Sequence, residues 1–174
     1  KQSAEVLTCA ARAAEHWRDS TSRNKAILVS LRGSGHYLKK DYPAAITAYR
    51  EVVEITRSIS PESQDVALAL NDLAIAERAN KDYPAAERDY REALRIAKKN
   101  KNEALITTPL GNLVLLALDR EQWAEAESLA REALALAEKV GRQELIASDC
   151  HRLAKALLKQ NVGQIANLTT LQEA

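Results

Sequence analysis

The sequence has little of several residue types that mark particular protein classes: its 174 residues include only five glycines, four prolines and two cysteines. So few glycines and prolines argue against a collagen-like or low-complexity chain. The two cysteines, Cys9 and Cys150, form no CxxC pair and are too few for a disulfide framework. No apolar run approaches the roughly 20 residues that span a membrane, and no signal-peptide pattern opens the chain. We therefore expect reduced thiols and a cytoplasmic location.

Methionine is absent altogether, and the first residue, Lys1, is not one of the small residues that permit removal of an initiator methionine. We therefore expect the sequence to be a fragment of a larger protein. Part of the function is then expected to lie in residues outside it.

An excess of charge is also absent, because 25 lysines and arginines nearly balance 24 aspartates and glutamates, for a net charge of +1. Such a chain has no overall field that would attract nucleic acid or an anionic membrane. What the chain does have is 46% hydrophobic and 28% charged residues, with alanine and leucine outnumbering valine and isoleucine. This composition favours helices over strands.

Apolar residues recur at spacings of three and four along most of the chain, which predicts about nine amphipathic helices. Short breaks separate them, so neighbouring helices should pack as antiparallel hairpins. We expect Asp41 and Asp82 to cap two of the helices, with Pro43 and Pro84 in their first turns.

Three further signals concern where helices begin and end. Ser60 and Pro61 predict a helix start, with the serine as its cap. Gly141 predicts a helix end in the left-handed conformation. The sequence Asn161-Val162-Gly163 predicts a break between a helix over about 143–159 and a short last helix.

Two other places put unusual residues inside helical segments. Pro109 predicts either a kink near Leu105 or a helix that effectively starts at Thr108. Gly33 and Gly35 weaken a helix over about 23–38, and each costs about 1 kcal/mol relative to alanine. We expect close backbone packing at one of these glycines. Ile27, Leu28 and Leu31 supply the apolar side of the same helix.

One stretch of the sequence, Asp82–Leu94, recurs once before itself and once after. The earlier copy is Asp41–Val53 and the later copy is Gln122–Leu134, at steps of 41 and 40 residues. The leucines of the preceding helix recur in the same register, at Leu73, Leu113 and Leu153. Both helices of a pair therefore repeat together, and the chain is predicted to be a repeat array.

We expect a single repeat domain over residues 1–174. Its units are expected at 1–19 (a partial repeat or cap), 23–58, 61–99, 102–140 and 142–174, the last with a capping helix.

The segments Leu70–Ala74 and Tyr83–Glu87 resemble the signature of the tetratricopeptide repeat family in its longer, kinesin-light-chain-like form. The usual repeat is about 34 residues long, whereas the period here is 40 to 41. One departure is Arg32, which occupies the position that matches Leu73. The resemblance implies an all-α fold, an α-solenoid in which antiparallel helical hairpins stack into a right-handed superhelix. In such a fold the recurring tyrosines and alanines pack between helices.

In this family the first helix of each pair lines a concave groove that binds an extended segment or a helix. Mapped onto this sequence, the resemblance implies the groove residues Asn71, Asp72, Ile75, Arg78, Asn112, Leu115, His151, Arg152 and Lys155. Arg152, Lys155 and Lys159 lie on adjoining turns. They would form either a basic pocket for an acidic residue or a C-terminal carboxylate, or simply a solvated face.

No catalytic constellation is found in the sequence. The three histidines lie far apart, and the adjacent pair Cys150-His151 cannot make a metal site alone. Gly33-Ser34-Gly35 is too short for a phosphate loop. Acidic pairs such as Asp89 and Glu92 accompany arginines, as in solvating ion pairs. We expect neither an enzyme nor a bound cofactor or metal.

The sequence thus predicts a protein–protein interaction module, a scaffold or regulatory domain that binds a peptide or a partner domain, including one of its own chain. An alternative is a sensor or autoinhibitory region of a larger signalling ATPase, since longer repeats of this type resemble those that follow nucleotide-binding domains. A nucleic-acid-binding solenoid is disfavoured by Asp72 in the expected groove and by the near-neutral charge.

Overall fold

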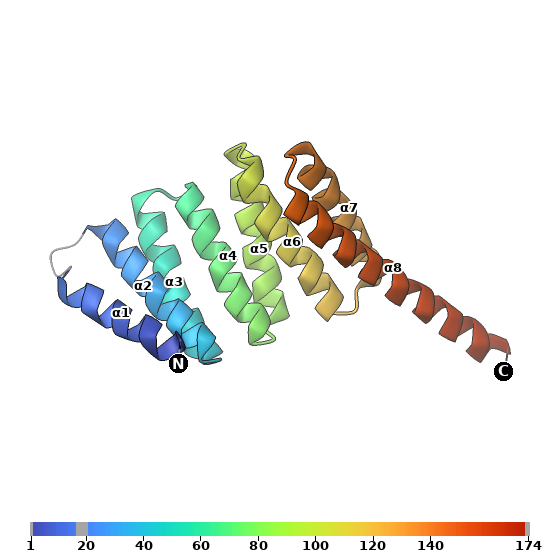
Figure 1. Ribbon diagram of the computed structural model, residues 1–174, viewed down its shortest axis with the longest axis horizontal. Coiled ribbons are helices and arrows are strands. Elements are labelled where there is room, and N and C mark those ends of the chain that lie inside the picture. Colours follow the sequence, from blue (N-terminus) through green and yellow to red (C-terminus); the bar gives the residue numbers. More distant parts are fainter. Residues whose placement is uncertain (1, 17–20, 173–174) are drawn as a thin grey trace. The chain divides into compact units, whose positions relative to one another are not determined.

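The structure is a computed structural model that describes residues 2–16 and 21–172, with the side chains of residues 2–15 and 21–162. The end of the predicted first unit, residues 17–19, lies outside the described residues. In the described ranges the chain forms eight α-helices and no strand, which confirms the all-α prediction (Figure 1). The helices are α1 (Gln2–His16), α2 (Ser22–Leu38), α3 (Tyr42–Ile59), α4 (Gln64–Ala79), α5 (Tyr83–Lys99), α6 (Glu103–Asp119), α7 (Trp123–Lys139) and α8 (Gln143–Gln172).

Five turns in the described chain share one backbone geometry. In each turn one residue adopts a positive φ, and the next residue donates its N–H to a carbonyl five positions back, as in a Schellman-type helix end. The left-handed residues are Lys40, Lys81, Lys101, Glu121 and Gly141. The prediction for Gly141 is therefore confirmed, with φ of 69°.

Two aspartates cap helices as expected. The Asp41 side chain accepts a hydrogen bond from the Ala44 N–H, and the Asp82 side chain accepts one from the Ala85 N–H, each over 3.3 Å. A proline follows in the first turn of α3 and of α5, where its missing N–H needs no helical acceptor.

The helix start predicted at Ser60 and Pro61 is wrong, because α4 begins three residues after Pro61 with Ser63 as its cap. The Ser60 N–H is bonded to the Thr56 carbonyl and so ends α3. Both serines have a side chain suited to capping, and only the path of the chain between the helices distinguishes them.

The break predicted at Asn161-Val162-Gly163 is also wrong, because α8 runs through it as one helix of 30 residues. A glycine inside a helix costs about 1 kcal/mol, but without a left-handed turn or a proline it does not end the helix. This continuity accounts for eight helices in the described residues where about nine were expected.

Pro109 lies inside α6, which begins at Glu103, so the predicted start at Thr108 is wrong. The proline lacks an N–H for the carbonyl of Leu105 one turn earlier, and the helix tolerates that missing bond.

The chain divides into two compact units, Lys1–Leu105 and Ile106–Ala174. In the first unit, helices α1 to α5 pack each against the next in sequence, and in the second unit α7 packs against α8. Alanines allow the close approach: Ala45, Ala74 and Ala86 are 0% exposed. The recurring tyrosines fill the remaining space, with Tyr90 fully buried, as the sequence predicted.

Close packing also explains the two glycines of α2. A methyl group at Gly33 would lie 2.9 Å from the Tyr49 ring, and one at Gly35 would lie 2.6 Å from the Leu7 side chain. Gly33 thus lets the Tyr49 ring pack against the α2 backbone, and Gly35 lets Leu7 of α1 pack against the same helix. The expectation of close backbone packing is confirmed at both positions.

Candidate functional site

A groove of about 500 Å³ lies between α2 and α4, with α3 beneath it, entirely inside the first unit. Small residues and hydroxyl side chains form much of its lining. The groove is lined by Arg23, Ala26, Ile27, Ser30, Leu31, Ser34, Val52, Thr56, Ile59, Asp65, Leu68, Ala69 and Asp72. Arg23 and Ser34 are 11 positions apart along α2, so the groove is roughly 16 Å long at about 1.5 Å per residue.

Exposed apolar side chains line this groove. Ile27 of α2 is 52% exposed, Leu68 of α4 is 48% exposed, and Ile59 at the end of α3 is 48% exposed. Single exposed apolar residues are ordinary, but several around one hollow are typical of an interaction site. The apolar side of α2 expected from Ile27 and Leu31 is therefore only partly used for packing.

The polar groups of the groove carry a net negative charge. Arg23 forms an ion pair with Asp65 over 3.5 Å at one end, and Asp72 contributes a second carboxylate. Burial raises the pKa of Asp72 above its ordinary value, and a hydrogen bond with Asn71 offsets part of that effect. A basic group entering the groove would therefore meet a carboxylate that is poorly hydrated.

Four of the residues predicted to line a groove lie on α4 in the first unit. Asp72 does line the groove described above, and Asn71 beside it is buried, at 6% exposed. Ile75 and Arg78 are partly exposed. Of this group, only Asp72 is among the lining residues of the α2–α4 groove.

The remaining predicted groove residues lie in the second unit. Asn112 is partly exposed on α6, and Leu115 of the same helix packs against the apolar core formed by Val114, Ala117 and their neighbours. His151 and Lys155 are exposed on α8.

Arg152 has a specific partner in this unit. Its Nη1 atom donates to Oδ1 of Asp149 over 2.6 Å, and the Asp149 carboxylate is buried. The guanidinium also lies against Gly111 of α6, where a methyl group would come within 2.6 Å of Nη1. The Arg152 side chain is only 20% exposed, whereas Lys155 and Lys159 are exposed. The three side chains predicted to form one basic cluster therefore have different surroundings.

Several groove residues were not identified from the sequence, chiefly Ile27, Asp65 and Leu68. For Asp65 and Leu68 a signal is present in the sequence of α4, because positions 65, 68, 72 and 75 follow the three-and-four spacing of one helix face. That face alternates carboxylates with apolar side chains, a pattern that fits a lined groove as well as a solvated surface.

No group of three or more His, Cys, Asp or Glu side chains that could hold a metal ion occurs among the described residues. Over the same residues no helix is long and apolar enough to cross a membrane. What the described surface does offer is a set of exposed apolar and charged side chains around the α2–α4 groove.

The helices form antiparallel hairpins in sequence order, with close alanine contacts and a groove between the first helices of two neighbouring hairpins. These features define a helical-repeat protein of the α-solenoid class. Two family models, each described as tetratricopeptide repeat, match residues 24–99 and 110–140. The chain belongs to the tetratricopeptide repeat family, as the sequence predicted. Proteins of this family are generally protein–protein interaction modules.

Solved structures with the same fold include TPR-like repeats of the kinesin-light-chain type. The kinesin-light-chain TPR-like repeats from Podosopora anserina match with a TM-score of 0.76 and 18% identity, over 98% of this chain and 85% of that chain. A second crystal structure of the same repeats gives a TM-score of 0.77 at 18% identity, over 98% and 84%. BtubC (BKLC) from P. vanneervenii gives 0.67 at 18% identity, over 90% and 68%. A comparison with curated protein sequences found no match.

Proposed function

We propose that this chain binds a short peptide segment of a partner protein in the groove between α2 and α4. The observation that carries the proposal is the set of large apolar side chains, Ile27, Ile59 and Leu68, that stay about half exposed around one hollow. Their burial by a ligand would remove apolar surface from water, at about 25 cal/mol for each Å².

The charges of the groove define the ligand further. Asp65 and Asp72 outnumber Arg23, and Asp72 is partly desolvated before any ligand arrives. A lysine or arginine of the peptide would pair with Asp72 through a charge-assisted hydrogen bond. The preferred ligand is thus a segment with two or three apolar side chains and one basic side chain.

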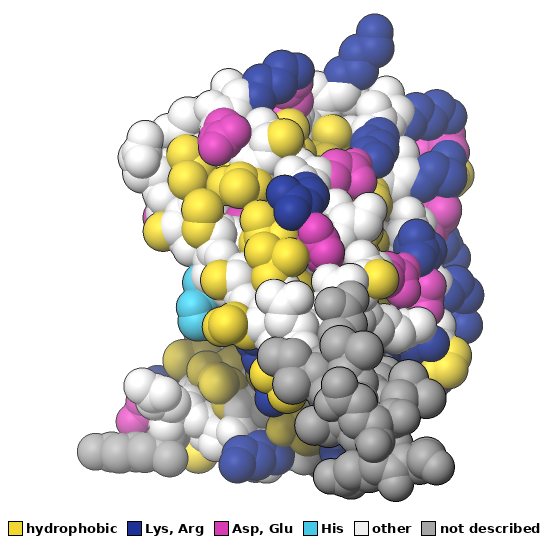
Figure 2. All heavy atoms as spheres, turned by 90° about the vertical axis from the view of Figure 1, so that its right-hand side faces the viewer, with side chains coloured by type: hydrophobic (Ala, Val, Ile, Leu, Met, Phe, Trp, Pro, Cys, Tyr) yellow, Lys and Arg dark blue, Asp and Glu magenta, His cyan; other side chains and the backbone are white. Residues whose placement is uncertain are grey.

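Nucleic acid is a poorer fit as a partner. Figure 2 shows basic and acidic side chains interspersed on the face that it presents, around a group of hydrophobic side chains. A backbone of phosphates binds best to a continuous basic surface. Among the described residues visible on that face, such a surface is not seen.

The proposal is tested by selecting binders from a random peptide library displayed on phage and measuring their affinity by fluorescence anisotropy. We expect the selected peptides to share apolar residues and one basic residue. Leu68→Glu should weaken their binding by about tenfold or more, which corresponds to about 1.4 kcal/mol. Asp72→Asn should weaken the peptides with a basic residue and leave their uncharged analogues nearly unchanged.

Leu158→Glu is the matched control, because Leu158 is 66% exposed on α8 and lies outside the groove. It introduces the same charge at another exposed leucine and should leave the affinity unchanged. Equal losses in the Leu68 and Leu158 variants, or peptides that bind both variants like wild type, would overturn the proposed site.

A further inference from the structure

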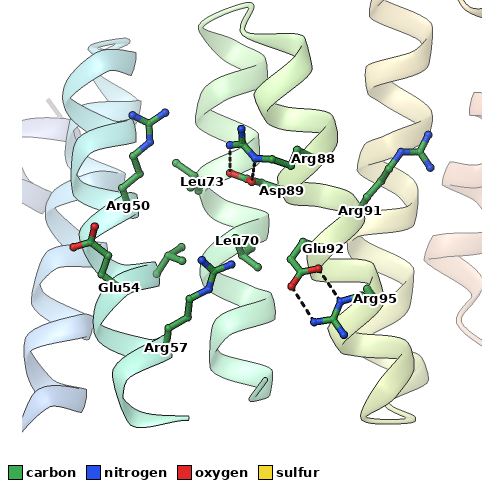
Figure 3. Close-up of a pocket in the computed structure, with 11 residues that line it drawn as sticks. Arg50, Glu54, Arg57, Leu70, Leu73, Arg88, Asp89, Arg91, Glu92 and Arg95 are labelled. Atoms are coloured by element: carbon green, nitrogen blue, oxygen red, sulfur yellow. Dashed lines mark hydrogen bonds and ion pairs between the residues drawn. The ribbon is translucent and has the colours of Figure 1, made fainter. Parts of the chain in front are cut away.

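A second cleft, of about 730 Å³, lies on another face of the first unit, between α3 and α5 with α4 as its floor. We call it the arginine cleft, and it is lined by Arg50, Val53, Glu54, Arg57, Leu70, Leu73, Arg88, Asp89, Arg91, Glu92 and Arg95. Arg50 and Arg57 extend from α3 and Arg88 and Arg95 from α5, with Leu70 and Leu73 between them (Figure 3). None of these residues lines the α2–α4 groove.

The five arginines of the cleft outnumber its three acidic residues. On the α5 wall the positive charge of the arginines is largely neutralised by acidic side chains of the same helix. Arg88 donates two hydrogen bonds to Asp89, of 2.8 and 3.2 Å, and Arg95 donates two to Glu92, of 2.7 and 2.9 Å. Arg91 pairs with Glu87 of the same helix over 2.9 Å.

The α3 wall retains unused positive charge. Arg57 makes no hydrogen bond or ion pair with any residue that the structure describes, and its charge interacts only at longer range with Glu92 on the opposite wall. Arg50 donates one hydrogen bond of 3.2 Å, to the buried carboxylate of Glu77, and its side chain remains 57% exposed. A guanidinium has five N–H donors, so most of those on Arg50 and Arg57 are available to a ligand.

The spacing of these groups favours a peptide over a continuous polyanion. Arg50 and Arg57 are seven positions apart, which is about two helical turns or roughly 10 Å. Glu54 lies between them on the same wall and would repel a phosphate backbone that passed across it. A peptide can place carboxylates opposite the two arginines and an uncharged residue opposite Glu54.

We propose that the arginine cleft binds an acidic peptide segment of a partner protein, with its carboxylates on Arg50 and Arg57. Guanidinium groups bind carboxylates through paired hydrogen bonds in a fixed geometry, which gives specificity for Asp and Glu over other acceptors. Leu70 and Leu73 form the floor and Val53 of α3 lies beside them; each is at most 5% exposed, so they offer only a small apolar contact to the segment. This site is independent of the α2–α4 groove.

The test uses a fluorescein-labelled peptide of glutamate, leucine and alanine, and measures binding by anisotropy at low and at physiological salt. Arg57→Glu should weaken binding by about tenfold, because it replaces an exposed cation of the cleft with an anion. Glu54→Lys should strengthen binding instead, by about threefold. Because both residues are exposed and form no hydrogen bond or ion pair within the described chain, each change should alter the thermal melt by no more than a few degrees.

Three comparisons discriminate the site from general attraction of charge. Arg57→Glu should not weaken binding of a peptide in which lysine replaces glutamate, and Leu68→Glu should leave binding of the acidic peptide unchanged. Polyuridylate RNA should bind more weakly than the peptide. Equal affinity of the Arg57→Glu and Glu54→Lys variants, or tighter binding of the RNA than of the acidic peptide, would overturn the proposal.

Discussion

Arg50 of α3 and Glu77 of α4 form an ion pair of 3.2 Å in which the arginine side chain is 57% exposed and the glutamate is fully buried. The Glu77 Oε2 atom has no hydrogen-bond partner among the described residues, and Asp89 places a second carboxylate nearby. Burial and then the Asp89 charge raise the pKa of Glu77 from 4.5 to about 7, against the opposing effect of Arg50. Forty positions after Glu77 and Asp89, the next repeat has Ala117 and Leu129, which pack in an apolar core. The two neighbouring carboxylates, Glu77 and Asp89, are therefore a departure from the repeat.

The first prediction concerns the pH dependence of stability at Glu77. Because its pKa is raised in the folded state, the folded protein binds the proton more tightly than the unfolded chain. This stabilisation is fully present below about pH 4.5 and is lost as the pH rises to about 7, by about 2 to 3 kcal/mol. Glu77→Gln should remove this component. Urea unfolding at several pH values should show that the free energy of unfolding of the variant increases relative to that of wild type as the pH rises from roughly 5 to 7. A constant difference would contradict the raised pKa.

The second prediction concerns the close contact at Ala86. This residue is 0% exposed, whereas Glu87 beside it is partly exposed and pairs with Arg91. Ala86→Arg should lower the free energy of unfolding by about 3 kcal/mol, because the larger side chain overfills a contact between helices. Glu87→Arg should cost less than about 1 kcal/mol, the usual value of an exposed ion pair. Thermal melts of the two variants make the comparison, and equal losses would show that the inward face is misassigned.

The third prediction concerns the left-handed turns. Gly141 has φ of 69°, and a methyl group there would meet no atom within 4 Å, so Gly141→Ala tests the backbone conformation alone. We expect a loss of about 1 kcal/mol. Lys81 has φ of 64° in a turn of the same backbone geometry, and Lys81→Gly should stabilise by roughly 0.5 kcal/mol. Calorimetry measures both changes, and a loss of stability in Lys81→Gly would contradict the assigned strain.

The fourth prediction separates structure from binding on α8. Arg152→Ala should destabilise the protein by about 3 kcal/mol, because it leaves the buried Asp149 carboxylate without its cation. Lys155→Ala should leave the melting temperature unchanged, because Lys155 is exposed. A loss of partner binding in Lys155→Ala would then indicate a site, whereas a loss in Arg152→Ala alone would reflect stability. Similar melting temperatures for both variants would contradict the structural role of Arg152.

Local signals were predictable where one short segment supplies both the residue and its partner. Asp41 and Asp82 cap helices through amides three positions away, and Gly141 ends a helix through its own backbone conformation. Ser60 and Ser63 are chemically equivalent as caps, and the choice between them depends on where the chain leaves α3. The sequence pattern does not contain that information.

Charged side chains were predictable in position but not in role. Arg152, Lys155 and Lys159 do share a helix, yet Arg152 alone has a buried acidic partner and lies against Gly111. Arg50 and Arg88 belong to copies of one motif, and their shared cleft is visible only when α3 and α5 are placed on either side of α4. Pairing of this kind depends on groups from other turns and other helices.

The sequence by itself determined the repeat, its period, the helical hairpins and the small residues that let helices meet, because these follow from local periodicity and from residue size. The tertiary structure alone decided which apolar side chains stay exposed, such as Ile27 and Leu68, and which charges find a partner. A side chain's burial and its electrostatic partner depend on atoms of neighbouring helices, and those neighbours are fixed only once the helices pack.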